Sequence, residues 1–220
     1  MNIDHSHHSP NFSGRDGADI SMLVLHATVG SYNSALNWLT NPASHVSTHY
    51  LIRKDGYIAQ LVADNLAAHH AGASKWFNLN AEAIREQSIG IELENKNNGL
   101  DPYPPAQMAA LLELSRALVA QYRIVPDMVT RHLDIALPKG RKTDPAGFPW
   151  LPFKAALYEP EPKVYRVRGL PIYQRQDLTG ALAGVLASGE SVSIDATYPN
   201  GAGHDALGRG FVDMDGLEAV

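Results

Sequence analysis

Short apolar runs of high β propensity alternate along this chain with helical patterns, and this alternation restricts the fold more than any other feature. The run ISMLVLHA, residues 20–27, predicts a buried strand, and SIGIELEN, residues 88–95, predicts another with a polar exit. Residues 31–41 read as a short helix, and residues 104–122 carry apolar side chains at helical spacing. Strands that alternate with helices indicate an α/β fold.

A hairpin makes the expected sheet mixed rather than purely parallel. In STHYLIRKDGYIAQLV, residues 47–62, two β-prone runs flank Asp55-Gly56, which is a strong turn signal. A last short helix is expected over residues 149–160. We therefore expect a mixed β-sheet flanked by helices in residues 1–158.

The composition changes after this first region. Alternating proline and glutamate in YEPEPK favour an extended chain, so we place a linker at residues 159–163. Residues 164–220 consist of short β-type runs separated by glycine, proline and asparagine, which predicts a small all-β barrel as a second domain.

Composition excludes several classes of protein. The chain has no cysteine, which rules out disulfides, thiolate metal sites and a cysteine nucleophile. Its net charge of −5 gives no reason to expect nucleic acid as a partner. We see neither a membrane-inserting stretch nor a signal peptide, so we expect synthesis in the cytoplasm, with release by another component if the protein acts outside.

Two histidines and one aspartate form a candidate metal set. His26 ends an apolar strand, His132 follows a short β-prone segment, and Asp144 comes twelve residues later. Two imidazoles and a carboxylate suit a catalytic zinc ion whose fourth position is left for water. The spacing is not a compact motif, so a buried histidine of the core remains the alternative at this stage.

Two carboxylates occupy one face of the second strand. Glu92 and Glu94 are two residues apart, whereas Asn95 lies on the other face. A carboxylate that faces a cleft beside a metal can act as general base, but a solvent-facing strand edge gives the same pattern. In RKTDPAGFPW, Lys142 stands two residues before Asp144, as either a loop ion pair or part of an active site.

Six segments occur in the order found in the zinc-dependent N-acetylmuramoyl-L-alanine amidases, which the chain resembles over roughly residues 9–158. This type-2 amidase and peptidoglycan-recognition family includes wall-recycling amidases, phage endolysins and peptidoglycan recognition proteins. The segments are MLVLHAT, STHYLIRKDGYIAQLV, HHAGAS, SIGIELEN, RHLDIA and RKTDPAGFPW. The fold of that family, a mixed sheet flanked by helices, agrees with the strand pattern.

The resemblance assigns roles to individual residues. It implies zinc bound by His26, His132 and Asp144, with Glu92 taking a proton from the attacking water and Lys142 beside the scissile carbonyl. It also matches His70 to a family histidine near the substrate cleft and His49 to another recurrent position, which we interpret as structural. The candidate substrate-binding residues are His70, His49 and Asn95.

Two departures from the family pattern concern the expected substrate-binding groove. The family often has tryptophan before its HAG, where this chain has His69. The segment LPKG, residues 137–140, looks like a small insertion that would bring Lys139 or Arg141 nearer the substrate.

Residues 164–220 resemble a bacterial Src-homology-3-like wall-binding domain, through VLASGESVSI and the final GRGFVDMDG. Four aromatic residues either line a sugar- or peptide-binding surface or pack within the barrel: Tyr165, Tyr173, Tyr198 and Phe211.

These features predict a peptidoglycan hydrolase that cuts between N-acetylmuramic acid and L-alanine, acts as an endolysin or lytic amidase on the wall after release, and is monomeric. The alternatives are a non-catalytic recognition module and a cytoplasmic wall-recycling amidase. A lysozyme-type glycosidase would instead use Glu92 and Glu94 as paired carboxylates.

Overall fold

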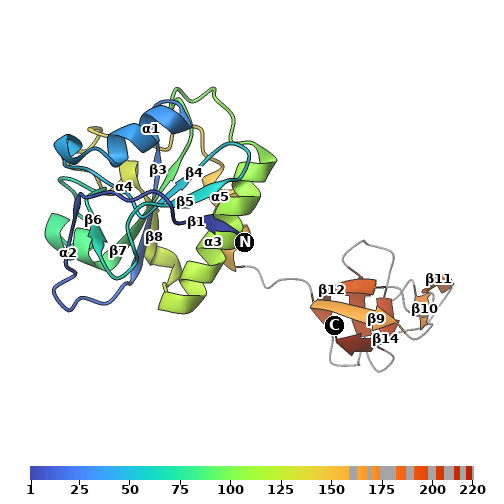
Figure 1. The fold of residues 1–220 in the computed structure, drawn as a ribbon. Coiled ribbons are helices and arrows are strands. Elements are labelled where there is room, and N and C mark those ends of the chain that lie inside the picture. Colours follow the sequence, from blue (N-terminus) through green and yellow to red (C-terminus); the bar gives the residue numbers. More distant parts are fainter. Residues whose placement is uncertain are drawn as a thin grey trace. The chain divides into compact units, whose positions relative to one another are not determined.

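The structure is a computed structural model that describes residues 1–158 in full and the backbone of seven strands within residues 159–220. The chain divides into two compact units, Met1–Tyr158 and Glu159–Val220 (Figure 1). Residues 159–162 of the expected linker lie outside the described residues. Of the helices that are described, none combines the length and the apolar character that a membrane crossing needs.

A six-stranded mixed sheet forms the centre of the first unit. The strand order is β1-β5-β4-β7-β3-β8, with bounds Ile3–Asp4, Ile58–Gln60, Tyr50–Ile52, Ser88–Leu93, Met22–Ala27 and Val129–Arg131 in that order. Strands β4 and β5 are antiparallel, and the other neighbours in this sheet are parallel. The predicted mixed sheet is therefore confirmed.

The antiparallel pair is the hairpin expected around Asp55-Gly56. Gly56 has a φ of +89°, and a Cβ there would lie 2.8 Å from the carbonyl oxygen of Ala106. Glycine is required for both reasons, because other residues resist a positive φ and the neighbouring helix leaves no room for a side chain.

Helices cover both faces of the sheet (Figure 1). Predicted helices 31–41, 104–122 and 149–160 correspond to α1, α3 and α5, whereas α2 and α4 were not expected because they are too short to show a period. The helices are α1 (Tyr32–Leu39), α2 (Ala81–Gln87), α3 (Pro105–Tyr122), α4 (His132–Ile135) and α5 (Trp150–Tyr158), with 3₁₀ turns at Pro42–Ser44 and Pro126–Met128 and a small sheet of β2 (Phe12–Ser13) and β6 (Ala67–Ala68).

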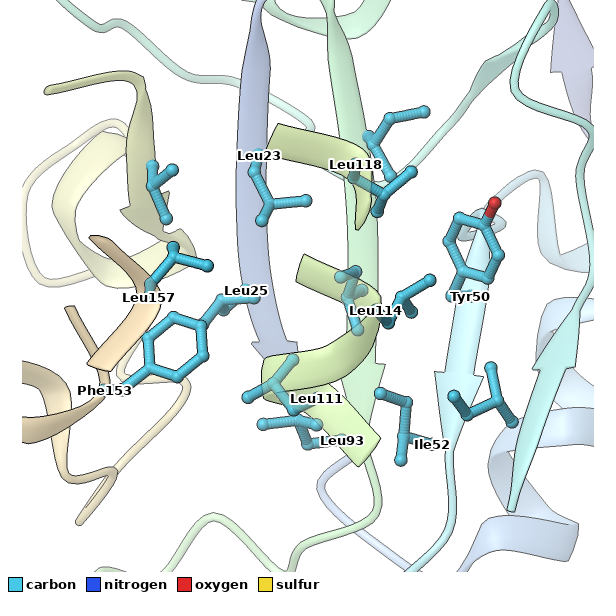
Figure 2. Close-up of a cluster of buried hydrophobic side chains, with 14 of the residues drawn as sticks. Leu23, Leu25, Tyr50, Ile52, Leu93, Leu111, Leu114, Leu118, Phe153 and Leu157 are labelled. Atoms are coloured by element: carbon cyan, nitrogen blue, oxygen red, sulfur yellow. The ribbon is translucent and has the colours of Figure 1, made fainter. Parts of the chain in front are cut away.

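The main core lies between the sheet and helix α3. Leu111, Leu114 and Leu118 of α3 are buried against Leu23 and Leu25 of β3 (Figure 2). Each leucine buried in this way contributes about 1.5–3 kcal/mol relative to an exposed one. Helix α5 adds to the same core.

The alternate residues of β3 face the other side of the sheet. Met22 and Val24 pack with Ile84 of α2 and Ile135 of α4. Since side chains alternate along a strand, His26 belongs to this second face. Being the penultimate residue of β3, it stands where the apolar layer ends and polar side chains begin.

Every described element of the second unit is a strand, in agreement with the all-β prediction. The sheet order is β11-β10-β14-β13-β12-β9-β15, and all neighbours are antiparallel. The strands are β9 (Lys163–Val167), β10 (Leu170–Tyr173), β11 (Leu182–Leu186), β12 (Ser191–Thr197), β13 (Ala202–Asp205), β14 (Phe211–Asp213) and β15 (Leu217–Ala219). The roles predicted for Tyr165, Tyr173, Tyr198 and Phe211 concern side chains that lie outside what the structure describes.

Candidate metal centre and active site

Three neighbouring parallel strands deliver functional side chains to one edge of the sheet. His26 of β3 is paired with Glu92 of β7, and Arg131 of β8 is paired with Leu25. His132 follows Arg131 directly and opens α4. Because the carboxyl ends of parallel strands meet at one edge, residues far apart in sequence come together there.

Asp144 reaches the two histidines from the loop after α4. The amide of Leu133 donates to the carbonyl of Asp144 at 2.9 Å, which holds this loop against α4. The Oδ2 atom of Asp144 lies 2.9 Å from Nδ1 of His132 and 3.5 Å from Nδ1 of His26. The two Nδ1 atoms are 3.0 Å apart. The three predicted metal ligands therefore form one compact cluster.

This cluster fits zinc. Ligand atoms about 2.0–2.1 Å from a tetrahedral zinc ion are roughly 3.3 Å from one another, which lies within the range of the measured separations. Two imidazole nitrogens and a carboxylate oxygen are also the donor types that zinc prefers. All three residues are buried, with exposures of 1%, 4% and 5% for His26, His132 and Asp144. The set can hold a metal ion and leave one position open.

Protonation within the cluster favours cation binding. Burial lowers the pKa of His26 to about 4, and the neighbouring His132 acts in the same direction, so His26 is neutral and keeps a lone pair. Burial alone would raise the pKa of Asp144, but hydrogen bonds with His132 and His26 hold it well below its usual value. The cluster thus offers one carboxylate and a neutral imidazole at neutral pH.

Glu92 presents an unsatisfied carboxylate oxygen beside the cluster. Its Oε2 atom is buried and has no hydrogen-bond partner among the described residues. Burial, and to a smaller extent the charge of Asp144, raise the pKa of Glu92 to about 8 against the opposing effect of Lys142. A carboxyl group poised near neutral pH in a cavity is what general acid–base catalysis requires.

A cavity of about 240 Å³ joins these groups. The three metal-ligand candidates, Glu92 and Lys142 all line it, and a neighbouring cavity of about 530 Å³ shares His132, Lys142, His69 and His70. Within residues 1–158, the ammonium group of Lys142 has no hydrogen-bond or ion-pair partner, so the loop ion pair with Asp144 is absent and the cation is free to meet a ligand.

Sequence reasoning missed Trp38 of α1 as a wall of the site. Its side chain lines the 240 Å³ cavity and a smaller one beside Glu92, yet the residue is 56% exposed. A large aromatic residue on the exposed face of a short helix was the available signal. Trp38 and His69 both line this cavity.

Glu94 has a different role from Glu92, and it lies just beyond β7, which ends at Leu93, rather than within the strand as expected. Its Oε1 accepts a hydrogen bond from the amide of Tyr32 and its Oε2 from the amide of Lys54, both at 3.0 Å. This carboxylate anchors the start of α1 and the hairpin. A glycosidase with Glu92 and Glu94 as its working pair would lack a second free carboxylate.

Two residues expected near the substrate are fully buried. His49 lies 3.0 Å from Nη2 of Arg15 through Nε2, and its Nδ1 accepts the amide of Gly90 at 3.0 Å. Asn95 donates to the carbonyl of Asp101 at 2.8 Å. Their positions give the predicted substrate contact no support. Both residues instead hold neighbouring segments of the backbone together, which agrees with the structural role that the sequence also suggested for His49.

The LPKG segment brings one cation to the larger cavity. Arg141 lines it, while its Nε and Nη2 atoms donate to the carbonyls of Leu137 and Ala73 at 2.6 and 2.7 Å. Lys139 donates to the carbonyl of Asp134 at 2.5 Å. Arg141 is therefore the cation that this segment adds to the groove.

A mixed sheet that gathers two histidines, an aspartate and an unpaired glutamate in one cavity is typical of a metal-dependent hydrolase. The family model described as N-acetylmuramoyl-L-alanine amidase (Amidase_2) matches residues 16–147, and the chain belongs to this family.

Individual relatives agree with this assignment. N-acetylmuramoyl-L-alanine amidase AmiD from Escherichia coli is 42% identical over 146 residues, which cover 60% of this chain and 51% of AmiD. The chain thus spans about half the length of that relative. A crystal structure of AmpD has a TM-score of 0.59 at 30% identity, covering 71% of this chain and 95% of AmpD. E. coli AmiD in complex with anhydro-N-acetylmuramic acid-L-Ala-D-γ-Glu-L-Lys has a TM-score of 0.57 at 33% identity, covering 69% and 68%.

Proposed function

We propose that the chain is a zinc-dependent hydrolase of the amide bond between N-acetylmuramic acid and L-alanine of peptidoglycan. The observation that carries this proposal is the unpaired, buried Oε2 atom of Glu92, which shares a cavity with the His26, His132 and Asp144 cluster. Family membership supports the substrate class, and the ligand of the AmiD complex contains the same type of linkage.

An amide resists hydrolysis because its carbonyl is resonance-stabilised and its leaving amine is basic. Zinc, when bound, supplies Lewis acidity that polarises a carbonyl and lowers the pKa of water. Glu92 takes the proton of the attacking water at Oε2 and later delivers it to the leaving nitrogen. A cation at the cluster lowers the pKa of Glu92 below its metal-free value of about 8, as Lys142 already does, so the basic form is available near neutral pH.

Lys142 stabilises the negative charge that develops on the carbonyl oxygen. Lys142 lines both cavities, and its ammonium group has no hydrogen-bond or ion-pair partner within residues 1–158. A preorganised group of this kind typically contributes about 10²–10³ in rate.

Mass spectrometry of products from defined muropeptides tests the proposal. Intact disaccharide and 1,6-anhydro substrates are each expected to yield a free stem peptide with a new L-alanine amino terminus, and a chelator should stop the reaction until zinc is added. A recognition module would leave the substrates unchanged, whereas a glycosidase would release reducing sugar ends. Full activity after complete removal of zinc would contradict the metal assignment.

The Glu92→Gln variant tests the base separately from the metal. It should bind zinc like the wild type and lose turnover, because the amide cannot accept the proton of water. A normal rate in this variant would assign the base to another residue.

The second unit is proposed to bind the cell wall. Support comes from the sequence resemblance of residues 164–220 and from the all-strand backbone of this unit. Tethering an enzyme to a polymer raises its effective concentration on that polymer, which favours a lytic amidase or endolysin acting on the wall over a cytoplasmic recycling enzyme. Full-length Glu92→Gln protein should sediment with purified peptidoglycan even when excess soluble muropeptide occupies the cleft. Complete release by the soluble competitor would count against this second binding site.

A further inference from the structure

In both candidate ligand histidines, His26 and His132, Nδ1 points into the metal-ligand cluster and Nε2 lies close to a second partner outside it. Nε2 of His26 lies 3.0 Å from Nδ1 of His70, and Nε2 of His132 lies 3.2 Å from the carbonyl oxygen of Ala71. The two partners are consecutive residues of the HHAG segment. One short stretch of chain therefore provides the hydrogen-bond partner for the Nε2 atom of both imidazoles.

The directions of these hydrogen bonds follow from the chemistry of the ligands. An imidazole that binds a metal through Nδ1 must carry its proton on Nε2. The carbonyl of Ala71 can only accept, which agrees with a proton on Nε2 of His132. Nδ1 of His70 must then accept from His26, so the proton of His70 resides on its own Nε2.

Ser88 accepts the hydrogen bond from that N–H group. Nε2 of His70 lies 2.9 Å from Oγ of Ser88, and the Ser88 hydroxyl in turn donates to the carbonyl oxygen of Ile84. Because the hydroxyl hydrogen points at this carbonyl, a lone pair of Oγ remains to accept the hydrogen bond from His70. The whole series from His26 to Ile84 therefore has one consistent direction, and it ends on a backbone carbonyl that cannot reverse it.

Close packing against Gly90 also restricts the position of the His70 ring. A Cβ at Gly90 would lie 2.6 Å from Cγ of His70, so the ring occupies the space that a side chain at position 90 would take. Ser88 and Gly90 lie on the same face of β7 as Glu92. Strand β7 thus supplies the general-base candidate, the acceptor for His70 and the space for its ring.

We infer that His70 and Ser88 are positioning residues that fix the tautomer and orientation of the metal ligand His26. This inference rests on the proposed function, in which His26 binds zinc. Both ring nitrogens of His70 are used by His26 and Ser88, so His70 offers a substrate the face of its ring rather than a hydrogen bond. Outer partners of this kind typically contribute 10- to 100-fold in metal affinity.

Zinc affinity of the full-length protein, measured by competition with a chromophoric chelator at fixed pH, tests the inference. His70→Phe fills the space but removes the acceptor, and it should weaken zinc binding about 10- to 100-fold. His70→Asn restores an acceptor oxygen near the place of Nδ1 and should recover much of that affinity. His69→Phe, which removes the adjacent imidazole that forms no hydrogen bond with His26 or His132, should bind zinc like the wild type.

Ser88→Ala provides a variant that keeps every imidazole and changes the buried volume little. It should weaken zinc binding less than His70→Phe, since His70 stays in place and still accepts from His26 but loses the acceptor that favours a proton on its Nε2. Nitrogen-15 NMR of labelled histidines in the zinc-loaded wild type should show His70 protonated on Nε2 and unprotonated on Nδ1. In Ser88→Ala the fraction of His70 that is protonated on Nδ1 should rise above the wild-type level, which a merely structural role of Ser88 would not produce.

The possible failures are distinguishable. If the wild type binds no zinc, the proposed function fails and this inference falls with it. If the wild type binds zinc and His70→Phe binds it equally well, the positioning role is refuted while the proposed function stands. A proton on Nδ1 of His70 in the zinc-loaded wild type would refute it as well.

Discussion

Replacing Glu92 by glutamine should stabilise the metal-free protein while removing its activity. Oε2 of Glu92 is buried without a partner, so the folded state holds the ionised carboxylate at a cost. Glutamine has nearly the same shape and no charge. The variant therefore removes the cost of ionisation and keeps the packing around β7.

The magnitude follows from the pKa of this group. Burial raises the pKa of Glu92 from 4.5 to about 8. One pKa unit corresponds to about 1.4 kcal/mol, so the raised pKa of Glu92 costs the fold on the order of 3 kcal/mol at pH 7, where the unfolded chain ionises this carboxyl and the folded chain still holds its proton. Because the folded-state pKa of this carboxyl is raised, stability is greatest below pH 4.5 and is lost as the pH rises toward 8. Glu92→Gln should accordingly gain little at low pH and most above neutrality.

Urea denaturation in the presence of a chelator, followed by tryptophan fluorescence, measures this difference. The three tryptophans of the chain, at positions 38, 76 and 150, all lie in the first unit, so the signal reports on that unit. The free energy of unfolding of Glu92→Gln should exceed that of the wild type at pH 8 and approach it at pH 4.5. A gap that is equal at both pH values, or a less stable variant at pH 8, would refute the reasoning.

Glu94→Gln is the matched control, at the residue that follows the end of β7. Its carboxylate accepts two backbone amides, from Tyr32 and Lys54. Glutamine offers a single acceptor oxygen, so this variant should be destabilised, by on the order of 1–3 kcal/mol. The same chemical change thus has opposite signs at two positions two residues apart.

Three further outcomes are expected. Lys142→Ala should lower kcat about 10²- to 10³-fold on defined muropeptides and leave zinc affinity unchanged, as measured by chelator competition. Leu114→Ala, in the core between α3 and the sheet, should cost about 2–5 kcal/mol in urea denaturation, and a loss below 1 kcal/mol would contradict its placement. Hydrogen bonds from Tyr57 and Ser6 lower the pKa of Asp4 to about 2, so this carboxyl stabilises the fold above pH 3.8 and the contribution disappears as the pH falls toward 2. Tyr57→Phe should flatten that part of the stability profile, and an unchanged profile would show that the tyrosine is not the cause.

Local sequence determined the elements with strong periodic or turn signals. The uncharged run before His26 predicts β3 because a central strand of a mainly parallel sheet is buried on both faces, and all six residues of β3 are buried. Asp55-Gly56 predicts the hairpin because Gly56 accepts a positive φ. Helices α2 and α4 were not predicted, because seven and four residues are too few to define a helical period.

The order of six segments also indicated the family and the ligands His26, His132 and Asp144. The sequence alone left open whether these residues meet, since His26 and His132 are 106 positions apart. Only the parallel arrangement of β7, β3 and β8 brings the strand ends together. That pairing is set by packing across the whole sheet, not by residues near either histidine.

Only the tertiary structure shows which of Glu92 and Glu94 is available as a general base. Both residues fit a general base by type and strand face, but two backbone amides from other segments engage Glu94 and none reaches Oε2 of Glu92. Contacts between distant segments also determine three other features of the site. These are the burial of His49 and Asn95, the position of the exposed Trp38 at the cavity, and the hydrogen-bond series from His26 through His70 to Ser88. The sequence determined which chemical groups are available, and long-range packing decided which hydrogen bonds are already satisfied and hence which groups remain free to react.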